Sequence, residues 1–348
     1  MASKNNTVLA FGELMLRHSV NDINDISELD KADKSKFEDS YGGSEANVLA
    51  ALQNLGVNTR FLTAVPFTKE GEGAVKFLEG YNIDTNSIVV KGDNVGTYYV
   101  VTNCTDRAKA TKYDRDTAAI TEMTIDDIDL DRAFDGVELF HFSGVNLALK
   151  GHTRETCIEL LKEAKRRGIK VSFDFNYREN LWKKDNTELG RLQGQQEAKY
   201  VFNQIVPLCD IVFASKMDIE GWFDFSGSME DFLKAVPSID CIVSRDKKQL
   251  TKNSKEVVAG IHTKNGSYTL TPARKFNVRE NIGGGDAFDA GILYGLLNPE
   301  YSLEDATKFG VECYVMKHQI PGDVFIGVNK DKVEASMIEN ENANQKGE

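Results

Sequence analysis

The chain has 348 residues and a formal net charge of −12 at pH 7, with 41% apolar and 28% charged residues. Such a chain can bury a large core as one big α/β domain or two smaller ones, and its negative charge argues against non-specific binding to nucleic acid. No apolar run approaches the roughly 18 residues of a membrane span, and the 5 scattered cysteines form no Cys-x-x-Cys pair, so we expect a cytoplasmic protein with reduced thiols and no membrane partner.

The first part of the chain alternates strand and helix patterns. In order, we expect a strand over residues 7–11, a polar surface connection over 19–40, a helix after Gly42-Gly43, a strand over 60–65 and a helix over 73–78. Apolar runs of strand formers and apolar positions at helical spacing carry these expectations. The βαβ order predicts right-handed crossovers and a parallel sheet.

The alternation breaks between residues 87 and 115. The patterns at 88–90, 98–102 and 109–113 are all those of strands, with no helix between them. A run of strands inside an alternating protein suggests a small separate sheet, which can cover a cleft and exclude water; an ordinary hairpin on the rim is the alternative. We expect this lid to take its strands from about 13–20 and 87–115, and to hold a homo-oligomer together through its edges.

The alternation then resumes. We expect strands over 137–143, 169–175, 210–214 and 241–244, helices over 153–167, 197–206 and 303–317, and a hairpin of 257–262 and 267–270 around Asn265-Gly266. Residues 339–348 are polar and are expected to be a disordered tail. The sequence thus predicts one domain over residues 1–338, a doubly wound, mostly parallel α/β sheet with helices on both faces and a small β lid.

The most informative stretch is 281–291, in which Gly283, Gly284 and Gly285 precede Asp286 and an apolar helical pattern. Glycines expose bare N–H groups, and a helix N-terminus carries partial positive charge, so this turn suits a phosphate. An acid at its mouth can accept the proton of a hydroxyl that attacks the phosphate. The alternative is a flexible loop whose Asp caps the helix. No Lys-Ser/Thr follows the glycines, so this is not a Walker A loop.

Polar clusters also follow other predicted strands or precede their helices. They are Gly42–Asn47, Tyr113-Asp114-Arg115 and Asp174–Arg178. In open α/β sheets ligands bind at such strand ends, although a helix cap and a solvated charged loop are the alternatives for the first two. Arg115 and Arg178 together indicate an anionic substrate, because guanidinium groups match carboxylates bidentately. No histidine has metal-ligand spacing, and we expect no protein-built metal site.

These motifs together resemble those of the PfkB (ribokinase-like) family of sugar kinases, over nearly the whole chain. The family's first signature, Gly-Gly…Asn followed by Leu-Gly, is matched by Gly42-Gly43, Asn47 and Leu55-Gly56. The second, Asp-Thr-x-Gly-Ala-Gly-Asp-x-Phe, corresponds to Glu280–Phe288. Within the family the chain is most similar to 2-keto-3-deoxygluconate kinases, through Asp174–Arg178 with Leu181-Trp182, Tyr113-Asp114-Arg115 and Lys317–Asp323.

The resemblance implies roles for single residues. Asp286 would be the base, and the amides of Gly283, Gly284 and Gly285 would hold the charge of the transferring phosphate. The sugar acid would be bound by Gly42, Gly43, Ser44, Asn47, Tyr98, Tyr113, Arg115 and Arg178. ATP would be bound by Asn176, Ser215, Ser244, Gly283 and Gly285, with Mg²⁺ held largely by phosphates and waters.

Three departures from the family pattern affect the nucleotide side. Glu280 stands where the family usually has Asp, Ser215–Asp218 stands where it has Asn-x-x-Glu, and Arg245–Lys252 replaces an expected glycine-rich loop. The nucleotide contacts and a K⁺ site therefore stay open. The resemblance implies ATP-dependent phosphorylation of the terminal hydroxyl of 2-keto-3-deoxygluconate. A neutral-sugar kinase such as a fructokinase, and a catalytically silent sugar- or nucleotide-binding protein, are the alternatives.

Overall fold

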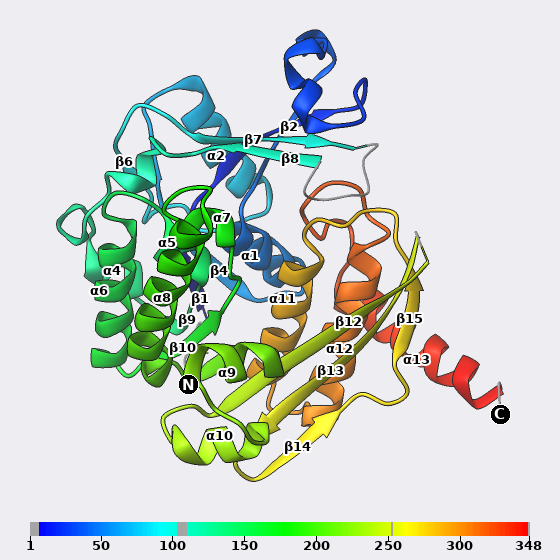
Figure 1. The fold of residues 1–348 in the computed structure, drawn as a ribbon. Coiled ribbons are helices and arrows are strands. Elements are labelled where there is room, and N and C mark those ends of the chain that lie inside the picture. Colours follow the sequence, from blue (N-terminus) through cyan, green and yellow to red (C-terminus); the bar gives the residue numbers. More distant parts are fainter. Residues whose placement is uncertain (1–6, 103–109, 252, 347–348) are drawn as a thin grey trace.

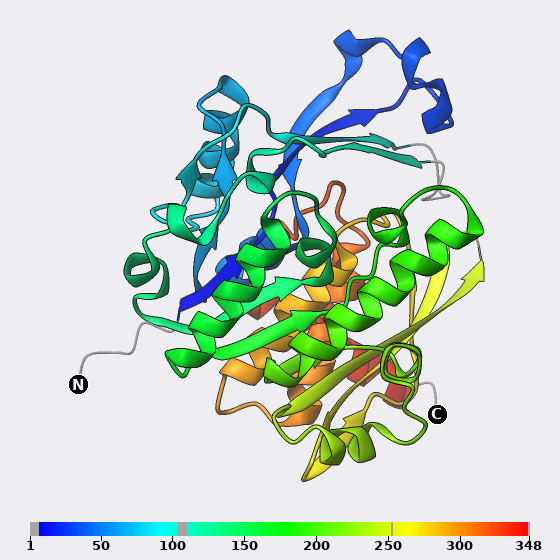
Figure 2. The same cartoon turned by 60° about the vertical axis from the view of Figure 1, so that its left-hand side comes forward.

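A large mixed sheet runs through the middle of the molecule, with helices on both faces and a smaller sheet standing over one end (Figure 1). The structure is a computed structural model that describes residues 7–102, 110–251 and 253–346, with the backbone alone for 341–346. Turning the molecule brings the smaller sheet into view as a cover above the strand ends (Figure 2). Among the described residues no helix is long and apolar enough to cross a membrane.

The main sheet is parallel except at one edge. Its order is β14 (Gly266–Thr269), β13 (Ser254–Thr263), β12 (Cys241–Thr251), β11 (Ile211–Phe213), β10 (Lys170–Asp174), β9 (Val137–Ser143), β1 (Thr7–Phe11) and β4 (Asn58–Leu62), while β15 (Arg274–Asn277) pairs with β13. All neighbours from β4 to β12 are parallel, and β13 is antiparallel to its partners. The expected doubly wound sheet and the hairpin at Asn265-Gly266 are confirmed.

Two apolar cores lie on the two faces of this sheet. In β1, Val8 and Ala10 join one core while Leu9 and Phe11 join the other, because successive side chains of a strand point to opposite faces. The first face is covered by α1 (Ser44–Asn54), α11 (Gly284–Leu297) and α12 (Leu303–Lys317), and the second by α5 (Gly144–Ala148), α6 (Thr153–Arg166) and α8 (Glu188–Ile205). A strand buried on both faces is typical of a parallel sheet.

Further helices complete the body. They are α2 (Lys69–Gly80), α4 (Leu130–Phe134), α7 (Glu179–Trp182), α9 (Lys216–Phe223), α10 (Met229–Ala235) and α13 (Lys330–Lys346), with 3₁₀ turns at Ile26–Lys31, Lys34–Lys36, Ala119–Thr121, Ile125–Asp127 and Val206–Leu208. The structure continues α13 into the polar stretch that was expected to be a disordered tail.

The smaller sheet is the lid. Its order is β3 (Glu38–Gly42), β2 (Met15–Val20), β7 (Gly96–Val101) and β8 (Thr111–Asp114). Two expectations need correction. The supposed connection over 19–40 ends in β3, whose exposed polar residues gave no apolar periodicity. Residues 88–90 contain β6 (Val89–Val90), which pairs with β5 (Ala64–Val65) outside the lid. Residues 103–109 of the expected lid lie outside the described residues.

A further difference concerns β12, which was expected to end at Ser244. The strand continues through the charged run to Thr251, and Arg245 pairs with Ala259 while Lys247 pairs with Val257 of β13. The charges suggested a loop, but β13 offers an apolar strand to pair with. The resulting hairpin of β12 and β13 is the longest in the sheet and rises past its edge (Figure 1).

Candidate active site

A large cleft opens where the parallel strands end beneath the lid. Its volume is about 920 Å³. Its walls come from the ends of β1, β10, β11 and β12, from the start of α1 and α11, and from the lid strands β7 and β8. This is the place where open α/β sheets bind their ligands.

The glycine turn forms one wall of the cleft and leads into α11, as the sequence predicts. Gly283 has a left-handed φ of 76°, and a Cβ on it would lie 1.8 Å from the carbonyl oxygen of Asp323. Only glycine fits such a position. Among the described residues no side chain caps α11 at Gly283, so its first amides are available to an anion in the cleft.

Asp286 lies in the first turn of α11 and lines the cleft. Its two carboxylate oxygens accept hydrogen bonds from Asn47 Nδ2 at 2.7 Å and from Ser44 Oγ at 3.0 Å. Burial raises the pKa of Asp286 above its ordinary value, and the two hydrogen bonds oppose that shift. The carboxylate is therefore oriented and available as a proton acceptor beside the glycine turn.

The start of α1 is the scaffold of this carboxylate. A Cβ on Gly43 would lie 2.0 Å from the carbonyl oxygen of Glu13, so a larger residue would push α1 away from the end of β1. Ser44 Oγ in turn accepts a hydrogen bond from Asn176 Nδ2 at 2.9 Å. Ser44 and Asn47, expected to bind the sugar, thus also hold Asp286, and Asn176, expected to bind ATP, lies on the same side.

The two arginines expected to clamp a carboxylate differ in their surroundings. Arg115 is 9% exposed and forms an ion pair with the buried carboxylate of Glu13. Burial raises the pKa of Glu13 although Arg115 opposes the shift. Arg178 is exposed and lines the same cleft. Most of the Arg115 charge is therefore neutralised within the protein, and Arg178 is the better placed of the two for an anionic substrate.

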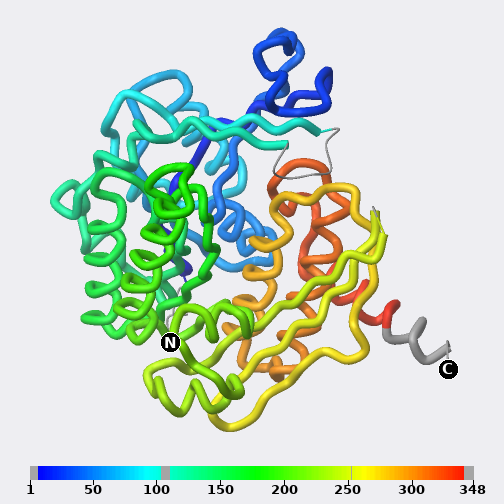
Figure 3. Tube along the Cα trace, viewed as in Figure 1, coloured from blue at the N-terminus to red at the C-terminus, as the bar shows by residue number. Residues whose placement is uncertain are grey.

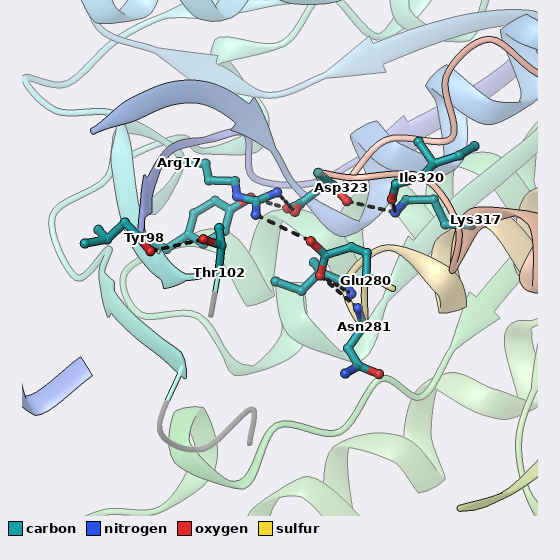
Figure 4. A network of polar contacts seen from close by, with 11 residues as sticks. Arg17, Tyr98, Thr102, Glu280, Asn281, Lys317, Ile320 and Asp323 are labelled. Atoms are coloured by element: carbon teal, nitrogen blue, oxygen red, sulfur yellow. Dashed lines mark hydrogen bonds and ion pairs between the residues drawn. The ribbon is translucent and has the colours of Figure 1, made fainter. Parts of the chain in front are cut away.

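A buried polar network joins the lid to the loop after α12 (Figure 4). Arg17 of β2 donates from Nη1 to Asp323 Oδ1 at 2.5 Å, and Tyr98 of β7 donates its hydroxyl proton to the other oxygen of Asp323. Tyr98 also stacks on Tyr113 of β8 with ring centroids 5.7 Å apart. Both tyrosines line the cleft as expected, whereas Gly42, which is buried in β3 beside Tyr98 and Asp323, does not reach it.

Lys317 lies at one end of this network and is fully buried. Its ammonium group donates to the carbonyl oxygens of Ile320 at 3.0 Å and Gly322 at 2.8 Å. Burial lowers its pKa from 10.5 to about 8, against the attraction of Glu280, Asp323 and Asp286. A fixed cation therefore sits behind the glycine turn.

Glu280, the first departure from the family pattern, stabilises the turn from its N-terminal side. Its carboxylate accepts hydrogen bonds from the amides of Asn281 at 2.8 Å and Ile282 at 3.2 Å, and lies 4.0 Å from Arg17. Glu13, Arg17, Glu280, Lys317 and Asp323 were not expected as site residues. Glu280, Lys317 and Asp323 lie within the motifs that carry the family resemblance, whereas Glu13 and Arg17 lie outside them.

Of the other two residues expected to bind ATP, one lines the cleft and the other does not. Ser215 lines the cleft and caps α9 by accepting from the Asp218 amide at 3.2 Å. Ser244 lies on the other side of β12, where its hydroxyl contacts His262 Nε2 at 2.9 Å. It is not among the residues that line the cleft, because alternate residues of a strand face opposite ways.

Glu45 gives a prediction about stability. It is 1% exposed, and burial raises its pKa from 4.5 to about 7. The folded protein therefore binds more protons than the unfolded chain between these two pH values, and the free energy of unfolding falls as pH rises through them. We expect this fall in the free energy of unfolding to be smaller by ~3 kcal/mol in Glu45→Gln, as measured by urea denaturation at the two ends of this pH range. Glu38→Gln, at an exposed position, is the control, and an unchanged pH dependence in Glu45→Gln would contradict the prediction.

Comparisons with known proteins agree with this geometry. Residues 5–322 match the model of the pfkB family carbohydrate kinase. A 2-dehydro-3-deoxygalactonokinase from Haloferax volcanii is 26% identical over 330 residues, covering 94% of this chain and 95% of the relative. Among solved structures, a PfkB family carbohydrate kinase from Listeria grayi superposes with a TM-score of 0.84 at 28% identity, covering 96% of this chain and 100% of that chain. The 2-dehydro-3-deoxygluconokinase from Thermotoga maritima also gives 0.84, at 25% identity, covering 96% and 98%.

Proposed function

The chain belongs to the pfkB family of carbohydrate kinases, and on that premise we propose that it transfers the γ-phosphoryl group of ATP to the terminal hydroxyl of 2-keto-3-deoxygluconate. The observation that carries the proposal is Asp286, held by Asn47 and Ser44 at the start of α11 beside uncapped amides. Relatives named for 2-dehydro-3-deoxy sugar acids support this substrate class.

In the proposed reaction Asp286 takes the proton of the sugar hydroxyl while its oxygen attacks the γ-phosphorus. The bond from that phosphorus to the β–γ bridging oxygen breaks, and its electron pair leaves with ADP. The amides of the glycine turn stabilise the charge on the transferring group. Lys317 is buried behind the turn, where its positive charge is less screened by water than that of an exposed lysine.

The proposed kinase reaction involves Mg²⁺, and a K⁺ ion would need ligands of a different kind. Within the described ranges no group of 3 or more His, Cys, Asp or Glu residues could hold a metal ion. We propose that Mg²⁺ arrives with ATP and is held by phosphates and waters. A K⁺ ion would need carbonyl oxygens, and two that converge in the loop after α12 already accept from Lys317. We therefore place no K⁺ ion in that loop.

Arg178 provides the test of acid against neutral sugar. A hydrogen bond to a charged group is worth enough that Arg178→Ala should raise the KM of a sugar acid about 10- to 100-fold, and leave the KM of a neutral sugar nearly unchanged. Arg166→Ala is the control, since Arg166 is tied to Glu163 on α6 outside the cleft. An equal change for acid and neutral sugars would show that Arg178 does not bind the carboxylate.

The proposal as a whole is tested by a coupled assay of ADP release with ATP and Mg²⁺ over a panel of sugar acids and neutral sugars. We expect the highest kcat/KM for 2-keto-3-deoxygluconate. Preference for fructose would favour the neutral-sugar alternative, and calorimetric binding of sugar or ATP without ADP release would favour a silent binding protein. We also propose that the chain acts in the cytoplasm as a homo-oligomer paired through β3 and β8, the outer strands of the lid.

A further inference from the structure

We propose that Arg245 is a catalytic residue that binds the transferring phosphoryl group, and that the β12–β13 hairpin replaces a glycine-rich loop as the source of charge for the phosphates of the nucleotide. The inference rests on the proposed kinase function and adds a residue to it. Arg245 lines the cleft, and its Nη2 lies 3.3 Å from the point where a Cβ on Gly285 would sit. The guanidinium is thus next to the amides that open α11.

The Arg245 guanidinium is held in place by stacking. Its Cζ lies 4.7 Å from the ring centre of Phe288 and 5.0 Å from that of Tyr314. These rings belong to α11 and α12, so the cation is fixed relative to the glycine turn. Stacking on two aromatic rings reduces the conformational entropy lost when such a side chain binds a ligand.

One face of this guanidinium is still without a hydrogen-bond acceptor. Its Nη1 is buried and has no hydrogen-bond partner in the part of the chain that the structure describes. A buried donor left unpaired is costly, and a polar group kept in that state commonly awaits a ligand. Since the atom belongs to a cation in the cleft, the matching ligand is an anion with two or more oxygens, such as a phosphoryl group.

Two acids that line the cleft near Arg245, Asp174 and Asp289, do not each cancel its charge. Asp289 is 2% exposed, and burial, together with neighbouring Asp174, raises its pKa well above the ordinary value. Burial therefore disfavours the negative charge on Asp289, and burial also raises the pKa of Asp174, so neither carboxyl group is a strong counter-charge for the arginine. The guanidinium keeps positive charge for a ligand.

Other cations of the β12–β13 hairpin support the same inference. Arg245 and Lys247 occupy alternate positions of β12 and both line the cleft, as does Lys255 of β13. Lys255 Nζ donates to Asn281 Oδ1 at 2.6 Å, at the start of the glycine turn. Lys248, on the opposite side of β12, pairs instead with Glu256 at 3.5 Å. The strand periodicity thus separates cations that face the cleft from one that does not.

This arrangement suits the chemistry of phosphoryl transfer. Negative charge spreads over the equatorial oxygens of the transferring group, and an arginine placed on them accelerates related reactions by about 10³- to 10⁵-fold. Arg245 forms and breaks no covalent bond here. It contacts the phosphoryl oxygens while the proton goes to Asp286 and the electron pair leaves with ADP.

The test compares Arg245→Met and Arg245→Lys with Lys248→Met, the control on the same strand. We expect kcat to fall about 10²-fold or more in Arg245→Met and by less in Arg245→Lys, while the KM for the sugar stays unchanged in both variants. Lys248→Met should keep the wild-type kcat. Added guanidinium ion at a non-denaturing concentration should partly restore the kcat of a further variant, Arg245→Ala. It should not restore the kcat of Asp286→Asn.

Two results would overturn the inference. One is a kcat within about threefold of wild type in both Arg245→Met and Arg245→Lys, since a phosphate-binding arginine contributes far more. The other is a raised sugar KM with normal kcat, which would indicate a role in shaping the sugar pocket. Neither result would affect the kinase proposal, which instead fails if the wild-type protein releases no ADP with any sugar.

Discussion

Asp286→Asn is expected to lower kcat by about 10³-fold, the usual contribution of a positioned general base, while sugar binding is retained. Asn has nearly the same shape as Asp, and its oxygen can still accept from Asn47, so the start of α11 should keep its fold. What is lost is the acceptor for the hydroxyl proton. Stopped-time assays of kcat and calorimetric titration of the sugar measure the two quantities separately.

The pH profile gives a second readout of the same residue. The base acts in its deprotonated form, and burial raises the pKa of Asp286. The kcat of the wild type should therefore fall as pH decreases through a value above that of an ordinary aspartate. Asp305→Asn is the matched control, because Asp305 holds the equivalent first-turn position in α12 and only caps that helix. Near-normal kcat in Asp286→Asn would disprove the assignment of the base.

Lys317→Met is expected to reduce the free energy of unfolding by about 3 kcal/mol, because it leaves two part-buried carbonyl oxygens and nearby carboxylates without their cation. Those carbonyls belong to Ile320 and Gly322. The loop they form packs against Gly283 through Asp323, so kcat should fall as well. Urea denaturation and the coupled assay measure the two effects.

Lys332→Met is the control for that experiment. Lys332 also donates to a backbone carbonyl, that of Gly327 at 2.6 Å, but it is exposed. A surface change of this kind should alter stability by less than about 0.5 kcal/mol. Equal losses in the two variants would mean that burial of the Lys317 ammonium is not what stabilises the loop.

The lowered pKa of Lys317 adds a dependence on pH. Its folded value of about 8 lies below the 10.5 of the unfolded chain, so between these values the unfolded chain binds more protons. The contribution of this group to the free energy of unfolding therefore rises with pH in that window. The rise should be absent in Lys317→Met.

Local patterns in the sequence were enough for much of the fold and for the centre of the site. The glycine turn, the acid that follows it and the apolar helix after that are neighbours in the chain, so propensity and periodicity carry the signal. Gly43 and Asn47 were found for the same reason. The parallel sheet followed from alternation of strands and helices, which is also a local property.

The residues that sequence reasoning missed depend on partners far along the chain. Glu13 neutralises Arg115 and Arg17 binds Asp323, and no local pattern predicts which charges become buried together. The length of β12 was misjudged for a related reason. The charged run after Ser244 has the composition of a loop, and only pairing with β13 makes it a strand whose alternate cations face the cleft.

The contact between Arg17 and Asp323 joins positions separated by 306 residues. In the traced chain the loop after α12 lies beneath the lid, to which Arg17 belongs through β2 (Figure 3). A chain that ends before that loop lacks Asp323, so Arg17 has no carboxylate partner and Gly283 has no loop packed against it. Copies of the chain that end before this loop should therefore be inactive.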